Sequence, residues 1–452
     1  MNQGLTIVPP PVVGEALRRL EARGFQAWCV GGCVRDSLLG KAPFDWDIAT
    51  SALPQETKAC FAGERLVEAG AAHGTIAWVP SGGHPIEITT FRSDGAYTDG
   101  RHPDSVAFSR RLEDDLSRRD FTVNAMAWHP QRGLVDLFHG QEDLSAGLLR
   151  CVGEPARRFS EDALRILRCL RFSSQLGFAI HPDTAQALWE KRELLLALSH
   201  ERVREELTKL LCGQGAAAVL RQYAAVVFTV LPELAPMKGC AQETPYHCFD
   251  VWEHTLHAVD YAPQQGNLRW AALLHDAGKP GRKTRSADGV AHFYGHPPES
   301  GRIARQLLTR LRFSNKERDR IAALVDHHED AMPMGEAHLK GLLGRYGERF
   351  VFTLFQLQEA DMSAKAPGVF ARRLPDLEES RALARAILER GDCLTLGDMA
   401  LTGEDLKALG VAPGPEMGKL LRRLLEAVQR GEAANTPAAL GELAKRLLKR
   451  GL

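Results

Sequence analysis

The sequence contains no apolar run of about 18 residues, the length that a membrane-spanning helix requires. Its N-terminus lacks the basic segment followed by an apolar segment that marks a secretory signal. These two absences predict a cytoplasmic protein that is not attached to a membrane.

Closely paired cysteines and an excess of charge of one sign are also missing. The nine cysteines include no CxxC pair, and only Cys29 and Cys33 lie close together in the chain. We therefore predict reduced thiols rather than a disulfide framework, with a zinc site as the alternative. Because Lys plus Arg and Asp plus Glu both number 57, any binding of nucleic acid must depend on local basic patches.

Length and composition indicate a multidomain globular protein. The 452 residues are 44% hydrophobic and 25% charged, which suits roughly three or four domains of about 100–200 residues each. Short strand-like runs dominate the first third, and helical periodicity dominates from Glu154 onward. The predicted fold class is an α+β head with a small mixed sheet, followed by all-α regions. The predicted boundaries are 1–150 for the head, 151–240 for a helical neck, 241–365 for a histidine-rich region and 366–452 for a helical tail.

Two aspartates stand one residue apart in "DWDIAT". Because side chains alternate between the faces of a strand, Asp45 and Asp47 are expected to project together while Trp46 packs inward. Two carboxylates so close repel each other unless a cation lies between them, and hard oxygen ligands suit Mg²⁺ shared with substrate phosphates. Glu87 in "IEITTF" is a candidate third carboxylate from a neighbouring strand. The alternative is a solvated strand end without a metal.

Adjacent glycines precede this acid pair in "VGGCVRD". A turn at Gly31-Gly32 lets backbone N–H groups approach a phosphate closely, and the start of the following helix favours negative charge. Arg35 lies one turn further on and is a candidate ligand for phosphate oxygens. Together with the acid pair, this pattern predicts metal-assisted phosphoryl or nucleotidyl transfer, in which metal ions hold the attacking and leaving oxygens.

The arginine-rich segment "EDALRILRCLR" predicts recognition of a base. Cytosine and adenine both present an amino donor beside a ring-nitrogen acceptor. Asp162 and Arg165, expected on one helix face, would pair with these two groups. Glu161 would hold Arg165 in place, and Arg168 and Arg171 would meet the triphosphate. The alternative is an ordinary capped helix whose acids and arginines form surface ion pairs.

These segments, with "RRDFTVNAMA" (Arg118–Ala127) and "ERVREELTKLL" (Glu201–Leu211), resemble successive motifs of class II tRNA nucleotidyltransferases, the bacterial CCA-adding enzymes. The resemblance runs in order over most of the chain and implies a head like that of DNA polymerase beta. It implies Mg²⁺ at Asp45 and Asp47. It implies nucleotide contacts at Gly32, Arg35, Arg119, Asp162, Arg165, Arg168 and Arg171. From "RRDFTVNAMA", only Arg119 and Asn124 are expected at the site.

Two further segments distinguish between enzymes that share these motifs but add different nucleotides. Bacterial poly(A) polymerases share the first motifs, but "EAGAAHGTIAWV" resembles the CCA-adding form. The polar segment Phe91–Ser105 resembles the flexible loop that CCA-adding enzymes need in order to accept A. Its presence argues against a CC-only enzyme and leaves CCA addition and A-only addition both open.

Histidines concentrate between His247 and His328 on helical segments. The adjacent His275-Asp276 in the apolar "WAALLHDAGKP" needs a buried partner, and a divalent metal satisfies both side chains. The order H…HD…H…H…D resembles the HD phosphohydrolase superfamily. That resemblance implies one metal at His254, His275, Asp276 and Asp361, and a second at His296 and His327. An oxygen and nitrogen ligand set of this kind suits Mn²⁺, Ni²⁺, Co²⁺ or Fe²⁺.

The predicted function is template-independent addition of CCA to the 3′ end of tRNA from CTP and ATP, with a separate metal-dependent phosphohydrolase centre. The tail helix would meet RNA through four basic residues, Lys419, Arg422, Arg423 and Arg430. The alternatives are an A-only or poly(A) polymerase, an HD phosphohydrolase with an RNA-binding head, and a non-enzymatic RNA-binding protein. The sequence does not specify the oligomeric state.

Overall fold

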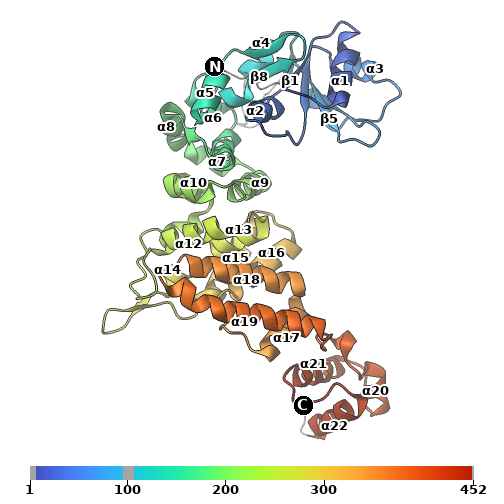
Figure 1. The fold of residues 1–452 in the computed structure, drawn as a ribbon, viewed down its shortest axis with the longest axis vertical. Coiled ribbons are helices and arrows are strands. Elements are labelled where there is room, and N and C mark those ends of the chain that lie inside the picture. The colour runs from blue at the N-terminus through green and yellow to red at the C-terminus, as the bar shows by residue number, and fades with distance from the viewer. Residues whose placement is uncertain (1–6, 95–105, 450–452) are drawn as a thin grey trace. The chain divides into compact units, whose positions relative to one another are not determined.

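The computed structural model of the chain describes residues 7–94 and 106–449. The chain forms two compact units, Met1–Pro232 and Glu233–Leu452, and each is described by itself (Figure 1). Most of the predicted loop Phe91–Ser105 lies outside the described residues. None of the described helices combines the length and the apolar character that crossing a bilayer requires.

The first unit contains a seven-stranded mixed sheet with strand order β3-β4-β5-β2-β1-β8-β9. β2 and β5 are parallel, and every other neighbouring pair is antiparallel. The strands of this sheet are β1 (Ala27–Val30), β2 (Asp47–Thr50), β3 (Leu66–Val67), β4 (Thr75–Trp78), β5 (Ile86–Thr90), β8 (Met126–His129) and β9 (Gly133–Asp136). The predicted small mixed sheet is confirmed.

Helices cover this sheet and bury its apolar residues. β1 is buried at all four positions, as expected of a strand covered on both faces. α1 (Pro11–Glu21) and α3 (Pro54–Cys60) pack on the sheet, and both carry proline in the first turn, where no hydrogen bond is lost. α4 (Leu112–Ser117) adds Leu112 and Leu116 to a core cluster with Trp28 and Phe91. A separate two-stranded ribbon is formed by β6 (Arg92–Asp94) and β7 (Val106–Phe108).

The first unit contains further helices, of which α7 packs closely against α9. They are α2 (Gly32–Leu38), which follows β1, and then α5 (Gly140–Ala146), α6 (Pro155–Glu161), α7 (Leu164–Leu176), α8 (Pro182–Glu190), α9 (His200–Leu211), α10 (Ala216–Gln222) and α11 (Ala224–Val230). A two-stranded parallel pair, β10 (Leu148–Leu149) and β11 (Ala179–Ile180), flanks α6 and α7 in the chain.

The helix predicted over "EDALRILRCLR" is interrupted, which corrects the sequence-based expectation. α6 ends at Glu161, Asp162 has an extended backbone (φ −140°, ψ 103°), and α7 begins at Leu164. The Asp162 Oδ1 atom accepts a hydrogen bond from the Leu164 N–H at 3.1 Å. A short polar side chain that caps the next helix competes with continuation of the preceding one, which accounts for the break.

The second unit is almost entirely helical. Its helices are α12 (Val251–Tyr261), α13 (Gly266–Leu274), α14 (Lys279–Arg282), α15 (His296–Arg310), α16 (Asn315–Asp326), α17 (Glu336–Tyr346), α18 (Glu348–Ser363), α19 (Val369–Glu389), α20 (Gly403–Ala408), α21 (Pro415–Gln429) and α22 (Pro437–Lys449). Local signals begin two of them: Asp250 caps α12, and Ser314 with Glu317 forms a capping box at α16. A short ribbon pairs β12 (Thr284–Arg285) with β13 (Ala291–His292).

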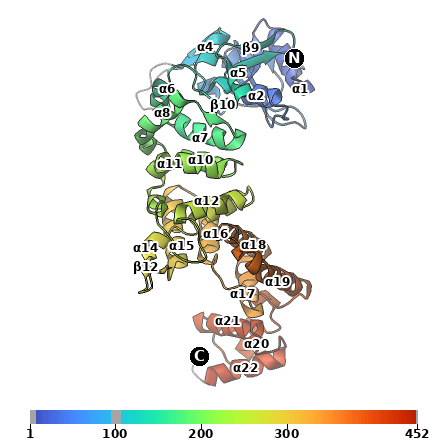
Figure 2. The ribbon, with the colours of Figure 1, turned by 60° about the vertical axis from the view of Figure 1, so that its left-hand side comes forward.

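The last three helices of this unit, α20 to α22, form a group with its own small core (Figure 2). Leu420 and Leu424 of α21 are fully buried in it beside Leu406 and Leu440. The four basic residues predicted for α21 or its end are exposed, so the helix is amphipathic as expected.

Candidate active site and histidine cluster

The acid pair lies at the start of β2, with Glu87 opposite. Asp45 is exposed just before the strand, Trp46 is buried, and Asp47 is the first residue of β2, in register with Glu87 of β5. Burial, with the charges of Asp45 and Glu87, raises the pKa of Asp47 to about 6. Among the described residues, no lysine or arginine forms an ion pair with these three carboxylates. A site with two or three uncompensated carboxylates fits Mg²⁺, which keeps several waters and shares phosphate oxygens.

The glycine turn brings a guanidinium close to the acid pair. Gly31 has a φ of +75°, and a Cβ atom added there would lie 2.9 Å from Arg119 Nη1. At Gly32, the position that the resemblance implies, a Cβ would meet only Arg35 Nη2 at 3.8 Å. Gly31 is therefore the position that needs glycine, both for its left-handed backbone and for the close approach of Arg119. The charge of Arg119 also acts on Asp47 and lowers its pKa against the larger raising effects.

A buried carboxylate connects α2 to α7. Asp120 Oδ2 accepts hydrogen bonds from Arg168 Nε and Nη2 at 2.8 and 2.6 Å, and Asp120 Oδ1 accepts from Asn124 Nδ2 at 3.1 Å. Asn124 Oδ1 in turn accepts from Arg35 Nη1 at 2.6 Å. We call Arg35, Asp120, Asn124 and Arg168 the Asp120 network. Burial opposes ionisation of Asp120, yet the charge of Arg168 and these hydrogen bonds lower its pKa to about 2.

Three arginines gather around one aromatic ring. The guanidinium carbons of Arg35, Arg168 and Arg171 lie 5.3, 5.4 and 4.2 Å from the centre of the Phe172 ring. Arg171 also lies 3.0 Å from a carboxylate oxygen of Glu206 on α9. Residues from α2 and α7 therefore form one basic surface, although about 130 residues separate them in the chain.

The predicted base-recognition residues lie at the α6–α7 break. Arg165 Nη1 is 2.9 Å from Glu161 Oε2, as predicted, and its Nη1 and Nη2 also donate to the backbone oxygens of Arg158 and Arg118. These contacts immobilise Arg165, which is 7% exposed. Asp162 lies 3.6 Å from Arg202 and is not on the same helix as Arg165. The two side chains are thus positioned by a break between helices rather than by helical spacing.

Asp120 was not predicted as a site residue: from "RRDFTVNAMA", only Arg119 and Asn124 were expected there. In the structure Arg119 pairs with Asp115 at 2.9 Å, and Asp120 pairs with Arg168. A single acid beside two arginines was the only local signal, and it does not show which distant arginine the acid meets.

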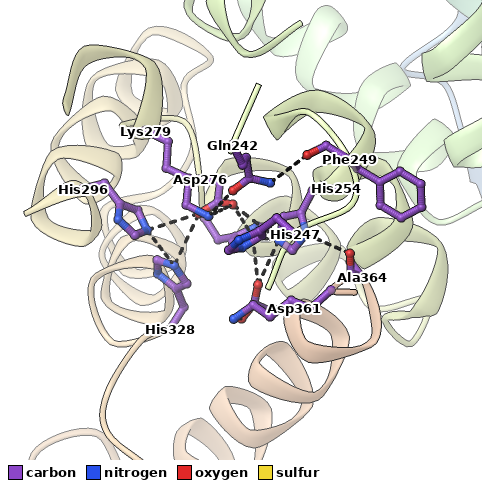
Figure 3. Close-up of polar contacts among 12 residues, drawn as sticks. Gln242, His247, Phe249, His254, Asp276, Lys279, His296, His328, Asp361 and Ala364 are labelled. Atoms are coloured by element: carbon purple, nitrogen blue, oxygen red, sulfur yellow. Dashed lines mark hydrogen bonds and ion pairs between the residues drawn. The ribbon is translucent and has the colours of Figure 1, made fainter. Parts of the chain in front are cut away.

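A second group of polar residues, all of them buried, lies among the helices of the second unit (Figure 3). One set of potential metal ligands is His254, His275 and Asp361, and a second set is Asp276, His296 and His328; in each set the ligand atoms lie within 4.8 Å of one another. We call these six residues the histidine cluster.

Asp276 faces both halves of the histidine cluster. Its Oδ2 atom lies 3.4 and 3.3 Å from the Nε2 atoms of His254 and His275. Its Oδ1 atom lies 3.2 and 3.7 Å from the Nε2 atoms of His296 and His328. Neither oxygen accepts a hydrogen bond of good geometry from the described residues. Asp276 would therefore be able to hold a metal ion together with either imidazole pair.

The orientation of the imidazoles supports this fit. Each Nδ1 atom lies within hydrogen-bond distance of a backbone oxygen: His254 to Ala364 at 3.1 Å, and His275, His296 and His328 each to the residue three positions earlier, at 2.8, 3.0 and 2.7 Å. An imidazole that donates through Nδ1 presents a lone pair at Nε2. All four Nε2 atoms therefore point as acceptors toward carboxylate oxygens, an arrangement that requires protons or metal ions between them.

Each carboxylate of the histidine cluster is paired with a lysine. Asp276 Oδ2 lies 2.7 Å from Lys279 Nζ, and Asp361 Oδ2 lies 2.7 Å from Lys365 Nζ. Burial opposes it, yet Asp276 and Asp361 raise the pKa of His275 well above its ordinary value. The two lysines balance the two carboxylates, so the group is electrically neutral when its histidines are neutral.

His327 does not belong to the histidine cluster, which corrects the prediction from sequence. Its Nδ1 atom lies 2.8 Å from Asp330 Oδ2, and His338 Nε2 lies 2.7 Å from the same oxygen. His327 follows the last residue of α16, and one further residue rotates the side chain of His328 toward Asp276. Periodicity could not distinguish the two because they stand at a helix end, where the regular 3.6-residue repeat stops.

Comparison with known proteins identifies the family. Residues 27–150 match the model of the poly(A) polymerase head domain, 177–237 that of an RNA- and SrmB-binding site of polymerase A, and 298–444 that of tRNA nucleotidyltransferase domain 2. The chain is 35% identical over 429 residues to the CCA-adding enzyme of Lactobacillus delbrueckii subsp. bulgaricus, covering 94% of this chain and 95% of that one. The chain belongs to the CCA-adding enzymes.

Other members of the family match this chain over nearly its whole length, and one of known structure shares its fold. The CCA-adding enzyme of Limosilactobacillus fermentum is 36% identical over 433 residues, or 96% of each chain. The crystal structure of the Bacillus stearothermophilus CCA-adding enzyme in complex with CTP has a TM-score of 0.74 at 31% identity, covering 98% of this chain and 100% of that one. The chain is thus a tRNA nucleotidyltransferase with a polymerase-beta-like head followed by helical regions, as predicted.

Replacement of Asp120 by asparagine is expected to destabilise the first unit. Asp120→Asn keeps the shape and the Oδ1 acceptor but removes the charge that pairs with Arg168. A folded pKa of about 2 against an unfolded value near 4 corresponds to about 2 kcal/mol at neutral pH. This contribution is present above pH ~4 and is lost as the pH falls toward ~2. Chemical denaturation of the wild type and the variant at several pH values measures it.

Asp183→Asn is the matched control, because the side chain of Asp183 is 80% exposed. A gap between the wild type and Asp120→Asn that stays constant from pH 6 to pH 2.5 would contradict the assigned ion pair.

Proposed function

We propose that this member of the family adds CCA to the 3′ end of tRNA, using CTP and ATP with Mg²⁺ in the head. The observation that carries the proposal is the uncompensated acid pair Asp45 and Asp47, placed beside the Gly31 turn and Arg119. The relative from Bacillus stearothermophilus was solved in complex with CTP, and residues 298–444 match a tRNA nucleotidyltransferase domain. Family membership and the site's charge therefore support the same activity.

The roles of the head residues follow from their contacts. Asp45 and Asp47 would hold Mg²⁺, with Glu87 as a further carboxylate on the adjoining strand. When bound, the metal would neutralise the charge that develops on the phosphate oxygens during attack by the tRNA 3′ hydroxyl. Arg119, close to Asp47, would bind the same phosphate group.

The arginine-rich surface around Phe172 would hold the remainder of the triphosphate. Arg35 and Arg168 are anchored by the Asp120 network, and Arg171 lies beside Glu206, so their guanidinium groups are positioned before substrate binds. Asp162 and Arg165 would recognise the amino group and ring nitrogen that cytosine and adenine share. Glu161 would act indirectly, by fixing the orientation of Arg165.

The test of this function supplies CTP and ATP separately to tRNA transcripts that end before, within and after CCA. Addition of C to the shortest transcript and of A only after C is the expected result. Incorporation of ATP alone on every transcript would instead identify an A-only or poly(A) polymerase.

Removing either charge of the acid pair is expected to abolish nucleotide addition. Asp45→Asn and Asp47→Asn each weaken the metal site, and loss of several kcal/mol of transition-state stabilisation corresponds to at least about a hundredfold lower rate. Binding of tRNA should remain, because neither side chain is part of the basic surface. Single-turnover addition and a filter-binding assay measure the two properties separately. Addition at near wild-type rate by either variant would refute the metal assignment.

Loosening Arg165 is expected to reduce nucleotide selectivity without abolishing catalysis. Glu161→Gln removes the charged partner at 2.9 Å, so misincorporation of UTP should rise by about tenfold, as expected for the loss of one charge-assisted contact. Arg157→Ala is the matched control, because Arg157 also contacts Glu161 at 3.0 Å but is 78% exposed. Equal misincorporation by the two variants would show that the Glu161–Arg165 contact does not determine selectivity.

We propose a second function for the histidine cluster: a metal-dependent phosphohydrolase centre of the HD type. The spacing of its ligand atoms carries this proposal, since the contacts from 2.9 to 3.7 Å match the edges of a coordination shell with bonds of about 2.1 Å. Imidazole and carboxylate ligands suit Mn²⁺, Fe²⁺, Co²⁺ or Ni²⁺. A metal held there would supply an activated water; Asp276 and Asp361 would be ligands beside the imidazoles, whose orientation the backbone oxygens at Nδ1 fix.

Loss of one imidazole is expected to remove metal from the histidine cluster. His328→Ala should lower bound transition metal by at least about tenfold and abolish hydrolysis of a 2′,3′-cyclic nucleotide, because one of few ligands is missing. CCA addition should survive. His327→Ala is the matched control, since this neighbouring imidazole contacts Asp330 instead. Metal analysis of purified protein and a hydrolysis assay measure the outcome, and equal metal loss in both variants would contradict the assignment of His328.

A further inference from the structure

A cavity of about 680 Å³ opens onto the histidine cluster. Its lining includes Asp361 and His328, one residue from each half of the cluster. Cavities of 300–1,000 Å³ accommodate molecules the size of a nucleotide, whereas a single phosphate ion would leave most of this space empty. We call this space the Lys365 cavity. Its size indicates a substrate that extends well beyond one phosphate group.

The cationic side of the Lys365 cavity has an inner and an outer part. Lys365 is held at 2.7 Å from Asp361 and is therefore next to the cluster. Arg372 and Arg373, in the first turn of α19, also line the cavity but are exposed, so they lie at its mouth. Within residues 7–94 and 106–449, Arg372 Nε donates only to the backbone oxygen of Gly368 at 3.1 Å, and Arg373 lies 3.8 Å from Asp376. Because these two guanidinium groups form few contacts within the protein, they suit the binding of a second anion.

Two acidic residues also line the Lys365 cavity, and neither cancels the outer arginines. Asp330 is bonded to both His327 and His338 through one oxygen. Glu329 Oε1 lies 3.7 Å from His296 Nε2, on the side of the cluster. The negative charge of the wall is therefore directed toward imidazoles, while its positive charge at the mouth faces solvent.

An aromatic ring and a neutral imidazole complete the lining. Tyr246 is 59% exposed, and its backbone oxygen accepts a hydrogen bond from the Ala366 N–H at 2.8 Å, which fixes it beside the turn that carries Lys365. An exposed ring of this kind offers a face on which a base can stack. His247 lies against the cluster in Figure 3, and its Nε2 atom has no hydrogen-bond partner among the described residues.

We propose that the Lys365 cavity binds a nucleoside that carries a second phosphate besides the one that reacts. The reacting phosphate would lie at the histidine cluster, the base against Tyr246, and the second phosphate on Arg372 and Arg373. The proposal rests on the hydrolytic function proposed for the cluster. In the reaction, the oxygen of water bonds to phosphorus, the bond from phosphorus to the ribose oxygen breaks, and a proton from water passes to that oxygen. Inorganic phosphate and the shortened nucleoside phosphate are the products.

The experiment compares adenosine 3′,5′-bisphosphate with adenosine 3′-monophosphate as substrates of the Mn²⁺-loaded full chain. We expect kcat/KM to favour the bisphosphate by about tenfold, the gain expected from charged hydrogen bonds to one phosphate. The double variant Arg372→Ala/Arg373→Ala should lose this preference through a higher KM for the bisphosphate. Arg385→Ala, an exposed arginine further along α19, should keep it. Tyr246→Ala should raise KM for both substrates, and Tyr246→Phe should not.

The remaining outcomes separate the proposed binding site from the hydrolytic function on which it rests. Hydrolysis of p-nitrophenyl phosphate without preference for the bisphosphate would overturn the inference and leave the hydrolytic function standing. Absence of hydrolysis, with calorimetric binding of the bisphosphate that depends on Arg372 and Arg373, would refute the hydrolytic function and support the binding site. Nucleotide addition in the same samples controls for the head. A short RNA with a 3′-phosphate shows whether the substrate is an RNA end or a free nucleotide. Faster turnover of this RNA than of the bisphosphate indicates RNA ends, and slower turnover indicates free nucleotides.

Discussion

The buried ion pair between Asp120 and Arg168 is the interaction on which the arrangement of arginines around Phe172 depends. Asp120 is only 8% exposed, so its charge is stable because Arg168, Asn124 and a backbone N–H bind it. The same contacts orient Arg35 through Asn124 and bring α7 against the segment after α4. One carboxylate therefore sets the positions of arginines contributed by two separate elements, and the surface around Phe172 exists because of it.

The carboxylates of the head and those of the histidine cluster differ in how far neighbouring cations neutralise them. In the head, Asp45 and Asp47 stay uncompensated by described cations, and the pKa of Asp47 rises because burial and like charges both disfavour its ionised form. In the histidine cluster, each carboxylate is paired with a lysine and surrounded by imidazoles. The first arrangement suits a metal that arrives with the phosphates of a nucleotide. The second suits a metal retained by the protein, because nitrogen ligands hold transition metals without help from substrate.

Much of the site could be predicted from local patterns. Trp46 is buried between Asp45 and Asp47 as expected, although β2 begins only at Asp47, and adjacency placed His275 and Asp276 together in an apolar segment. The prediction of one helix running through Asp162 was wrong, because the Asp162 side chain accepts a hydrogen bond at the start of the next helix. The prediction of His327 as a ligand was wrong because His327 and His328 both stand where α16 ends. These errors share a cause: at the end of an element the periodic rule no longer fixes the direction of a side chain.

The sequence by itself determined the family, the mixed sheet of the head, the acid pair and most members of the histidine cluster. The sheet and the acid pair follow from residue types over a few neighbouring positions, whereas the family and the histidine set were implied by the resemblance of ordered motifs along the chain to known families. The tertiary structure alone decided that Asp120 meets Arg168, that three arginines surround Phe172, that Asp276 faces two imidazole pairs, and that Lys365 lies beside a cavity. Those relations join residues tens of positions apart, and they depend on how helices and strands pack against one another, which no local pattern encodes.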